Sequence, residues 1–261
     1  MSYRPLYTGE GKFYEDLEIY KLYPSVSMLV QQAIRPIHPP LLPPVAKKHT
    51  EAMLWGTSVH AVLEALGKGK PAPPLAMKDS DIREAKVCAE RVWAEIQEAL
   101  VFGPYSMFEE TLAYRVGEET YFCGTADVLG ISGTSCTIVD YKMSPSEKAP
   151  AKSWVRREHE IASTAYRMMV KSLGKFRRIT CLYVYANRAG HTYIHEFKRD
   201  PVVEGVVLSA LNLLRYRWSE ETAVAQSLIH DYSDRHINGA VDEEPEQRIL
   251  QQQLHSTEGE Y

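Results

Sequence analysis

The stretch that decides the fold runs from Gly124 to Lys142 and reads GTADVLGISGTSCTIVDYK. Glycines fall between two apolar runs, and this pattern predicts two strands joined by a turn. Side chains alternate between the two faces of a strand, so we expect Asp140 and Lys142 to point the same way, roughly 6–7 Å apart. Asp127 lies on the preceding strand, and its side chain can meet Asp140 across an antiparallel pair.

These acidic residues have two interpretations. In the first, Asp127 ends a strand, and Asp140 forms a surface ion pair with Lys142. In the second, the two carboxylates share a hard cation, because adjacent carboxylates repel each other and their oxygens suit Mg²⁺ or Mn²⁺. The apolar residues Ile138 and Val139 indicate a buried strand, where charges need a partner or a metal. The sequence therefore favours a metal-dependent catalytic site that contains Asp127, Asp140 and Lys142.

Outward from this hairpin, helices and strands are predicted from hydrophobic periodicity and turn residues. We expect strands at 110–116, 120–129, 137–143, 179–186 and 192–197, and helices at 50–66, 79–100, 153–172 and 201–218. Helices come first, followed by three strands, a helix, two strands and a helix. This order predicts an α/β or α+β domain with a central mixed sheet flanked by helices.

The two ends of the chain differ from this predicted domain at 50–218. Residues 1–49 are expected to be irregular, because prolines between 36 and 44 force extended backbone. Residues 219–261 hold ten acidic residues against two arginines, and we expect a mobile tail. Without that tail, 28 basic and 24 acidic residues remain, which leaves the body at about +4 although the whole chain is −4. Such a body is compatible with binding nucleic acid.

Several functional classes are disfavoured by composition. No apolar run approaches the roughly 18–20 residues of a membrane helix, so no membrane partner is expected. The first twelve residues lack a signal-peptide pattern, which predicts an intracellular protein. The four cysteines form no Cys-x-x-Cys pair, so they are expected to be reduced thiols packed in the core.

The hairpin motifs resemble those of the PD-(D/E)XK nuclease superfamily. Within it, the chain is most similar to the branch that contains the RecB-type nuclease domain and its phage and CRISPR-associated relatives. That branch shows Gly-x-x-Asp on one strand, matched by Gly124 to Asp127, and Asp-x-Lys on the next, matched by Asp140 to Lys142. The resemblance implies a restriction-endonuclease-like core.

The same branch carries a helical Gly-x-x-x-His motif whose histidine ligates the metal, and Gly56 to His60 matches it. Without the resemblance, His60 would be an ordinary packed helix residue. The resemblance implies that His60, the two aspartates and the backbone carbonyl of Tyr141 hold the metal. Glu110 is an outer-shell candidate, although a solvent-facing strand start fits it equally well.

The helix after the lysine supplies the expected DNA contacts. Relatives place Gln-x-x-x-Tyr there; Tyr166 fits, but Ala162 stands in place of the glutamine, so Tyr166 is either a DNA contact or a core aromatic residue. Basic residues on and after this helix are candidates for phosphate contacts or form a solvated surface. They are Arg156, Arg157, Arg167, Lys171, Lys175, Arg177 and Arg178.

The resemblance implies a Mg²⁺- or Mn²⁺-dependent deoxyribonuclease. We expect a cytoplasmic exonuclease that acts on a DNA end or a single strand in replication, recombination or repair. It is expected to be a stand-alone nuclease, such as a phage-encoded one, which would act in the host cytoplasm. The acidic tail could bind a recombination or replication protein. No iron–sulphur cluster is expected, because no cysteine follows Cys181. The alternatives are an endonuclease with the same site and a catalytically silent nucleic-acid-binding module. A zinc hydrolase is disfavoured, because the sequence contains no clustered set of His and Cys ligands.

Overall fold

The computed structural model describes residues 3–8, 11–19, 21–34, 43–75, 77–99 and 106–215. These residues belong to a compact unit that ends at Leu214, apart from the last one, Arg215. The expected acidic tail at 219–261 lies outside the described residues. Among the described residues, no helix is both long enough and apolar enough to cross a membrane.

A five-stranded sheet with the order β4-β5-β6-β7-β8 forms the centre of the fold. Its strands are β4 (Met107–Val116), β5 (Glu119–Ser132), β6 (Ser135–Met143), β7 (Arg178–Ala186) and β8 (Thr192–Phe197). β6 and β7 are parallel and the other neighbours are antiparallel. The parallel pair is joined by helix α4 (Arg157–Ser172), preceded by the short helix η1 (Lys152–Trp154), as a parallel connection requires a crossover. The predicted mixed sheet is confirmed.

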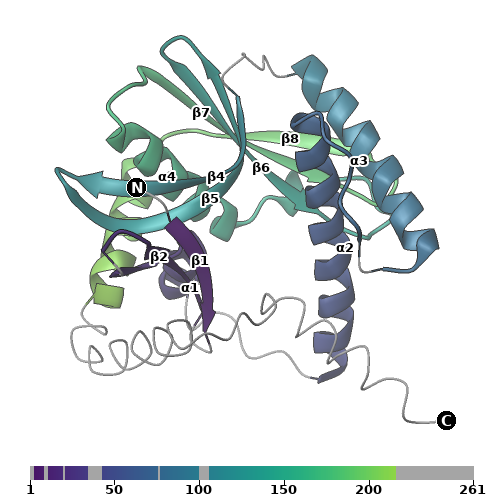
Figure 1. The fold of residues 1–261 in the computed structure, drawn as a ribbon, viewed down its shortest axis with the longest axis horizontal. Helices are drawn as coiled ribbons and strands as arrows, with labels where there is room; N and C mark the ends of the chain where they lie inside the picture. The colour runs from purple at the N-terminus through teal and green to yellow at the C-terminus, as the bar shows by residue number, and fades with distance from the viewer. Residues whose placement is uncertain are drawn as a thin grey trace. The chain divides into compact units, whose positions relative to one another are not determined.

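Helices cover both faces of this sheet (Figure 1). Helices α2 (Pro43–Gly67) and α3 (Asp79–Ala99) pack together on one face. Their apolar side chains, with Val59 and Val92 among them, form one core cluster with Val128, Val139 and Val184 of the sheet. Helix α4 contacts the sheet through β4 and β7.

The last described helix occupies residues 201–215. Asp200 caps it by accepting a hydrogen bond from the Val202 N–H at 2.8 Å, which is the cap expected from the sequence. Val203, Val207 and Leu211 are buried at intervals of four residues and anchor one side of the helix.

The N-terminal segment differs from its prediction. Instead of an irregular segment, β1 (Tyr3–Thr8), β2 (Gly11–Asp16) and β3 (Lys21–Pro24) form an antiparallel sheet, followed by α1 (Val26–Ile34). The expectation was wrong because it rested on prolines that follow α1. Two of those prolines begin α2, where the first turn tolerates a missing N–H. The small sheet buries Tyr14 and Tyr23 against Cys123 of β5, and this contact stabilises it.

Gly124 allows α1 and α4 to approach β5 closely. A Cβ atom at this position would lie 2.6 Å from Val26 Cγ2, 3.0 Å from Tyr166 Cε1 and 3.1 Å from Met169 Cε. The glycine of the Gly-x-x-Asp motif is therefore a packing residue, and it lies three positions before Asp127 on the same strand.

Candidate metal and catalytic site

The candidate site lies where β5 and β6 part. Their pairing extends from Ser132 and Ser135 to Val128 and Val139 and goes no further. At the next position, the Asp127 side chain enters the ladder, and its Oδ2 accepts a hydrogen bond from the Tyr141 N–H at 2.6 Å. The carboxylate thus takes the place of a backbone acceptor and is held beside β6.

Three potential metal ligands converge at this fork. One ligand atom from each of His60, Glu109 and Asp127 lies within 4.8 Å of the other two. His60 Nδ1 is 3.4 Å from Asp127 Oδ1. The histidine arrives from α2, one helical turn after Gly56, where an added Cβ atom would be 3.8 Å from the Met143 Cβ atom. Helix α2 therefore lies close to the end of β6 at this point.

The acidic residue contributed by β4 is Glu109, whereas the sequence prediction selected Glu110. Glu110 pairs with Ala126, one position out of register with Asp127, and it is absent from the converging group. Glu109 has a φ of 53°, a left-handed conformation that is unfavourable for a residue with a Cβ atom. Such local strain tends to occur at functional sites, where the surrounding structure holds it in place.

Asp140 and Lys142 lie beside this group and form an ion pair. Asp140 is only 6% exposed, in agreement with the buried strand predicted around it. The Lys142 ammonium also lies 5.3 Å from the centre of the Tyr183 ring. Asp140 is not one of the three residues whose ligand atoms converge, and its carboxylate pairs with Lys142.

His60 and Asp127 shift each other's pKa values. Burial lowers the pKa of His60, but the Asp127 carboxylate outweighs burial and raises that pKa above its usual value. Burial raises the pKa of Asp127, but His60 and then Lys142 outweigh it and hold that pKa below its usual value. The histidine and the aspartate therefore stabilise each other's charged forms.

The pKa values of Glu109, Asp140 and Lys142 reflect a buried, acidic environment. Burial, reinforced by the neighbouring Asp127 carboxylate, raises the pKa of Glu109 to about 7. Burial also raises the pKa of Asp140, although Lys142 opposes the shift. For Lys142, burial lowers the pKa, but the Asp140 and Asp127 carboxylates raise it above its ordinary value, so the side chain remains a cation.

The side chains of Tyr166 and Arg167 donate hydrogen bonds to backbone carbonyls within the protein. The Tyr166 side chain is buried, and its hydroxyl donates a hydrogen bond to the Thr125 carbonyl at 2.7 Å, which braces β5 near Asp127. Arg167 donates to the carbonyls of Ile179 and Phe197, the latter at 2.6 Å. Of the two interpretations of Tyr166, the structure places it as a core aromatic residue. Arg167 was a candidate for phosphate contacts, and its hydrogen bonds instead support the sheet.

The remaining basic residues divide between the two ends of α4. Arg156 and Arg157 are exposed at the helix start, near the carboxyl end of β6, although each pairs with a glutamate. Lys171 lies at the helix end, roughly 21 Å along the axis from Arg157 at 1.5 Å per residue. Lys175 and Arg177 follow it, Arg178 begins β7, and all three are exposed. These four residues are therefore at the far end of the sheet from Asp140, where a phosphate held at the site is out of their reach.

His159 was missed by sequence reasoning. It lies near the start of α4, its ring is stacked on Tyr183 with centroids 5.5 Å apart, and its Nδ1 shares a 2.8 Å hydrogen bond with the Tyr185 hydroxyl. Burial and the Lys142 charge lower the pKa of His159 to about 4, so it is neutral near pH 7. No spacing in the sequence links it to Lys142, because their proximity depends on the α4 crossover.

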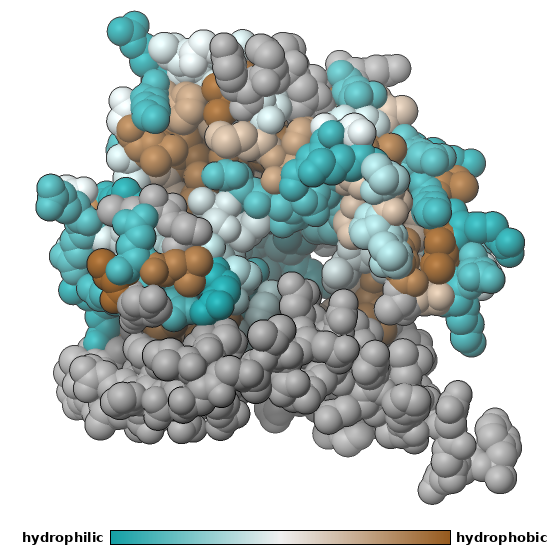
Figure 2. Space-filling view, in the orientation of Figure 1, coloured by the Kyte–Doolittle hydropathy of each residue, from teal (hydrophilic) through white to brown (hydrophobic). Residues whose placement is uncertain are grey.

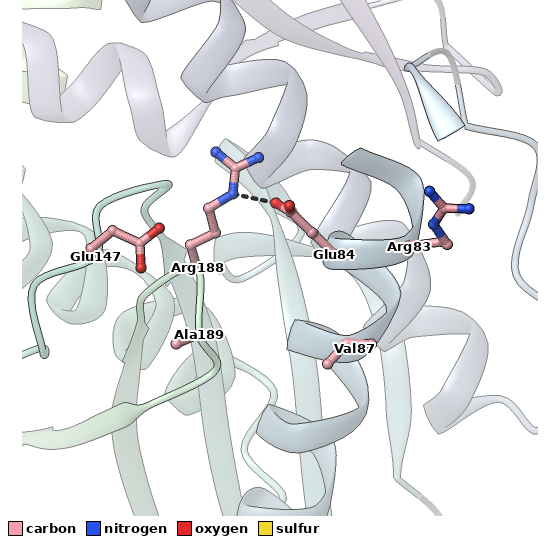
Figure 3. Close-up of a pocket in the computed structure, with 6 residues that line it drawn as sticks. All are labelled: Arg83, Glu84, Val87, Glu147, Arg188 and Ala189. Carbon is pink, nitrogen blue, oxygen red and sulfur yellow. Dashed lines mark hydrogen bonds and ion pairs between the residues drawn. The ribbon is translucent and has the colours of Figure 1, made fainter. Parts of the chain in front are cut away.

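A separate pocket of about 330 Å³ is lined by none of these residues (Figure 3). Arg188, which lines the pocket, forms ion pairs with Glu84 and with Asp81, the latter at 3.2 Å. These pairs connect the turn after β7 to α3. The residues that line the pocket are Arg83, Glu84, Val87, Glu147, Arg188 and Ala189.

The fold and the site define an α+β domain with two carboxylates and an imidazole beside a lysine–aspartate pair. No protein-family model and no curated protein matches the chain. Among solved structures, it is similar to a protein from Eubacterium rectale provisionally named an exonuclease, with 14% identity, a TM-score of 0.49, and coverage of 77% of this chain and 82% of that one.

The chain is also similar to the alkaline exonuclease LHK-Exo from Laribacter hongkongensis, with 12% identity, a TM-score of 0.37, and coverage of 79% of this chain and 94% of that one. The structure of LHK-Exo in complex with dAMP shows 9% identity and a TM-score of 0.33, over 83% of this chain and 94% of that one. These neighbours carry exonuclease names.

The donor set fits a divalent cation. Two carboxylates and one imidazole supply oxygen and nitrogen ligands, which suit Mn²⁺ and, with less affinity for the nitrogen, Mg²⁺. The cysteines offer no competing thiolate set, because all four are buried and free. A bound cation would also offset the repulsion between Glu109 and Asp127.

Metal binding should therefore stabilise the protein, and Glu109 should contribute to the effect. At about 100 times its Kd, Mn²⁺ should raise the free energy of unfolding by about 2.7 kcal/mol, or the Tm by roughly 5–11 °C. Differential scanning fluorimetry of wild type and Glu109→Gln measures this shift. The shift should fall sharply in Glu109→Gln and persist in the matched variant Glu110→Gln; equal shifts in both variants would contradict the placement of Glu109.

Proposed function

We propose that this chain is a divalent-metal-dependent deoxyribonuclease that hydrolyses phosphodiester bonds. The observation that carries the proposal is the convergence of His60, Glu109 and Asp127 at the fork between β5 and β6, directly beside the Asp140–Lys142 pair. Buried acidic groups gathered in this way, with a permanent cation alongside, suit the binding of a hard metal and of a phosphate.

The residues of the site have distinct roles in this proposal. His60, Glu109 and Asp127 would hold the metal, and the resemblance implies Asp140 and the Tyr141 carbonyl as further ligands. Once bound, a divalent cation lowers the pKa of water and offsets negative charge on a phosphate oxygen. Lys142 remains protonated, so its ammonium can stabilise the negative charge that develops on the phosphate or orient the attacking water. Tyr183 and Asp140 fix the position of that ammonium.

The reaction is a displacement at phosphorus. The oxygen of water forms a bond to phosphorus while the bond to the leaving sugar oxygen breaks. Water loses a proton to its surroundings, and the leaving oxygen gains one. The protein provides orientation and electrostatic stabilisation and forms no covalent intermediate.

The finer assignment is an exonuclease that degrades DNA ends or single strands in replication, recombination or repair. It is supported by the resemblance of the Gly-x-x-x-His, Gly-x-x-Asp and Asp-x-Lys motifs to the RecB-like branch. Encoding by a phage, action in the host cytoplasm and binding of a recombination or replication protein by residues 219–261 belong to the same proposal.

The test compares linear and covalently closed circular DNA with Mn²⁺, with Mg²⁺ and with a chelator. We expect the wild-type protein to release nucleotides from end-labelled linear DNA in the presence of metal only, and to leave the circle intact. Cutting of the circle would assign an endonuclease instead. A protein that degrades neither substrate with either metal would show that the proposed function is wrong.

A further inference from the structure

We propose that the small N-terminal sheet binds an unpaired nucleotide of the DNA strand that enters the site, through the Lys12 ammonium and the Tyr7 ring. This inference rests on the proposed function, because it assigns the substrate-binding surface of the same site. The surface is defined by Tyr7 on β1 and Lys12 on β2, which are directly opposite each other in the antiparallel pair.

The small sheet is anchored immediately beside the candidate metal ligands. The Tyr14 hydroxyl on β2 and the Thr125 hydroxyl on β5 share a hydrogen bond of 2.7 Å, and Thr125 lies two residues before Asp127. Lys12 and Tyr14 are two residues apart on the same strand and face the same way. The face that packs Tyr14 against the central sheet therefore continues to Lys12.

Lys12 provides a cation on the face of the small sheet that also carries Tyr14. Its ammonium lies 5.2 Å from the centre of the Tyr14 ring and 5.5 Å from that of Tyr7. None of the ion pairs between described residues includes Lys12, so its charge is available to a phosphate.

Tyr7 provides an aromatic surface at the same place. It is 61% exposed, although its ring lies against the Lys12 ammonium. An exposed ring next to a cation combines the two features by which proteins hold single-stranded nucleic acid: base stacking and phosphate contact. A base within a duplex is already stacked and paired, so the exposed ring favours an unpaired nucleotide.

The shape of the surface agrees with a strand that passes this sheet. The space-filling view shows a hollow with hydrophilic walls between the part of the surface that carries β1 and the part that carries α2 (Figure 2). β1 and β2 belong to the sheet that bears Tyr7 and Lys12, and α2 supplies His60. The exposed basic residues after α4 lie at the other end of the central sheet, which makes Lys12 the better-placed cation.

The experiment measures binding of a fluorescently labelled single-stranded oligonucleotide and of the matching duplex, in a chelator that prevents cleavage. Tyr7→Ala should weaken single-strand binding by about tenfold or more and change duplex binding less, whereas Tyr7→Phe should retain affinity. Lys12→Ala should reduce the slope of log affinity against log salt by about 0.7 for the single strand. Thermal melts of each variant confirm folding.

Lys21→Ala is the matched control, because Lys21 lies 5.5 Å from the Tyr23 ring on the same small sheet but pairs across the strands with Asp16, away from Lys12. It should bind like wild type. If Tyr7→Ala and Lys12→Ala also bind like wild type while the wild-type protein degrades DNA, the inference fails and the proposed function stands. If Tyr7→Ala weakens single-strand and duplex binding equally, the proposed stacking of an unpaired base on Tyr7 is wrong. If the wild-type protein neither binds nor degrades DNA, both proposals fail.

Discussion

Replacing Asp127 with asparagine should lower the rate of Mn²⁺-dependent DNA cleavage by a factor on the order of 10³. The aspartate lies 3.4 Å from His60 Nδ1 and belongs to the converging ligand group, so loss of its charge removes a ligand from the centre of the site. The amide retains a carbonyl oxygen that can accept the hydrogen bond from the Tyr141 N–H, so the strand fork should persist.

Single-turnover cleavage of end-labelled DNA measures this loss, and urea denaturation shows whether the variant is folded. Asp81→Asn is the control, because Asp81 pairs with Arg188 at the separate pocket and is not one of the converging ligands. It should cleave at the wild-type rate. Cleavage by folded Asp127→Asn at a rate similar to that of Asp81→Asn would remove Asp127 from the mechanism.

Replacing Lys142 with methionine should reduce cleavage by roughly 10²–10³-fold, the loss expected when one preorganised group that stabilises transition-state charge is removed. The ammonium lies between the Asp140 carboxylate and the Tyr183 ring, and methionine retains only the apolar stem. Lys142→Arg should recover part of the rate, because it restores the charge with a different shape.

Two measurements separate this role from metal binding. The Mn²⁺-dependent rise in Tm should survive in Lys142→Met, since the lysine is not a ligand, while the single-turnover rate falls. Lys152→Met, at an exposed position in η1, should leave both quantities unchanged. A Lys142→Met protein that keeps the wild-type rate would overturn the catalytic role of the ammonium.

Much of the fold was predictable because it depends on local patterns. The β5–β6 hairpin, the strand at Thr192–Phe197 and the Asp200 cap follow from alternation, glycine turns and capping chemistry. The N-terminal sheet was not predictable in this way. Its strands are short, and they are stabilised by contacts of Tyr14 and Tyr23 with β5, about a hundred residues later in the chain.

The sequence by itself determined which residues could form a site: two strand carboxylates with a lysine two positions after the second, and a helical histidine one turn after a glycine. Tertiary structure decided which acidic residue of β4 joins them, because a shift of one residue in strand register exchanges the faces of Glu109 and Glu110. It also decided that Lys12 lies near the site and that Lys171 does not. Periodicity is a property of neighbouring residues, whereas register and helix direction are set by contacts between segments far apart in the chain.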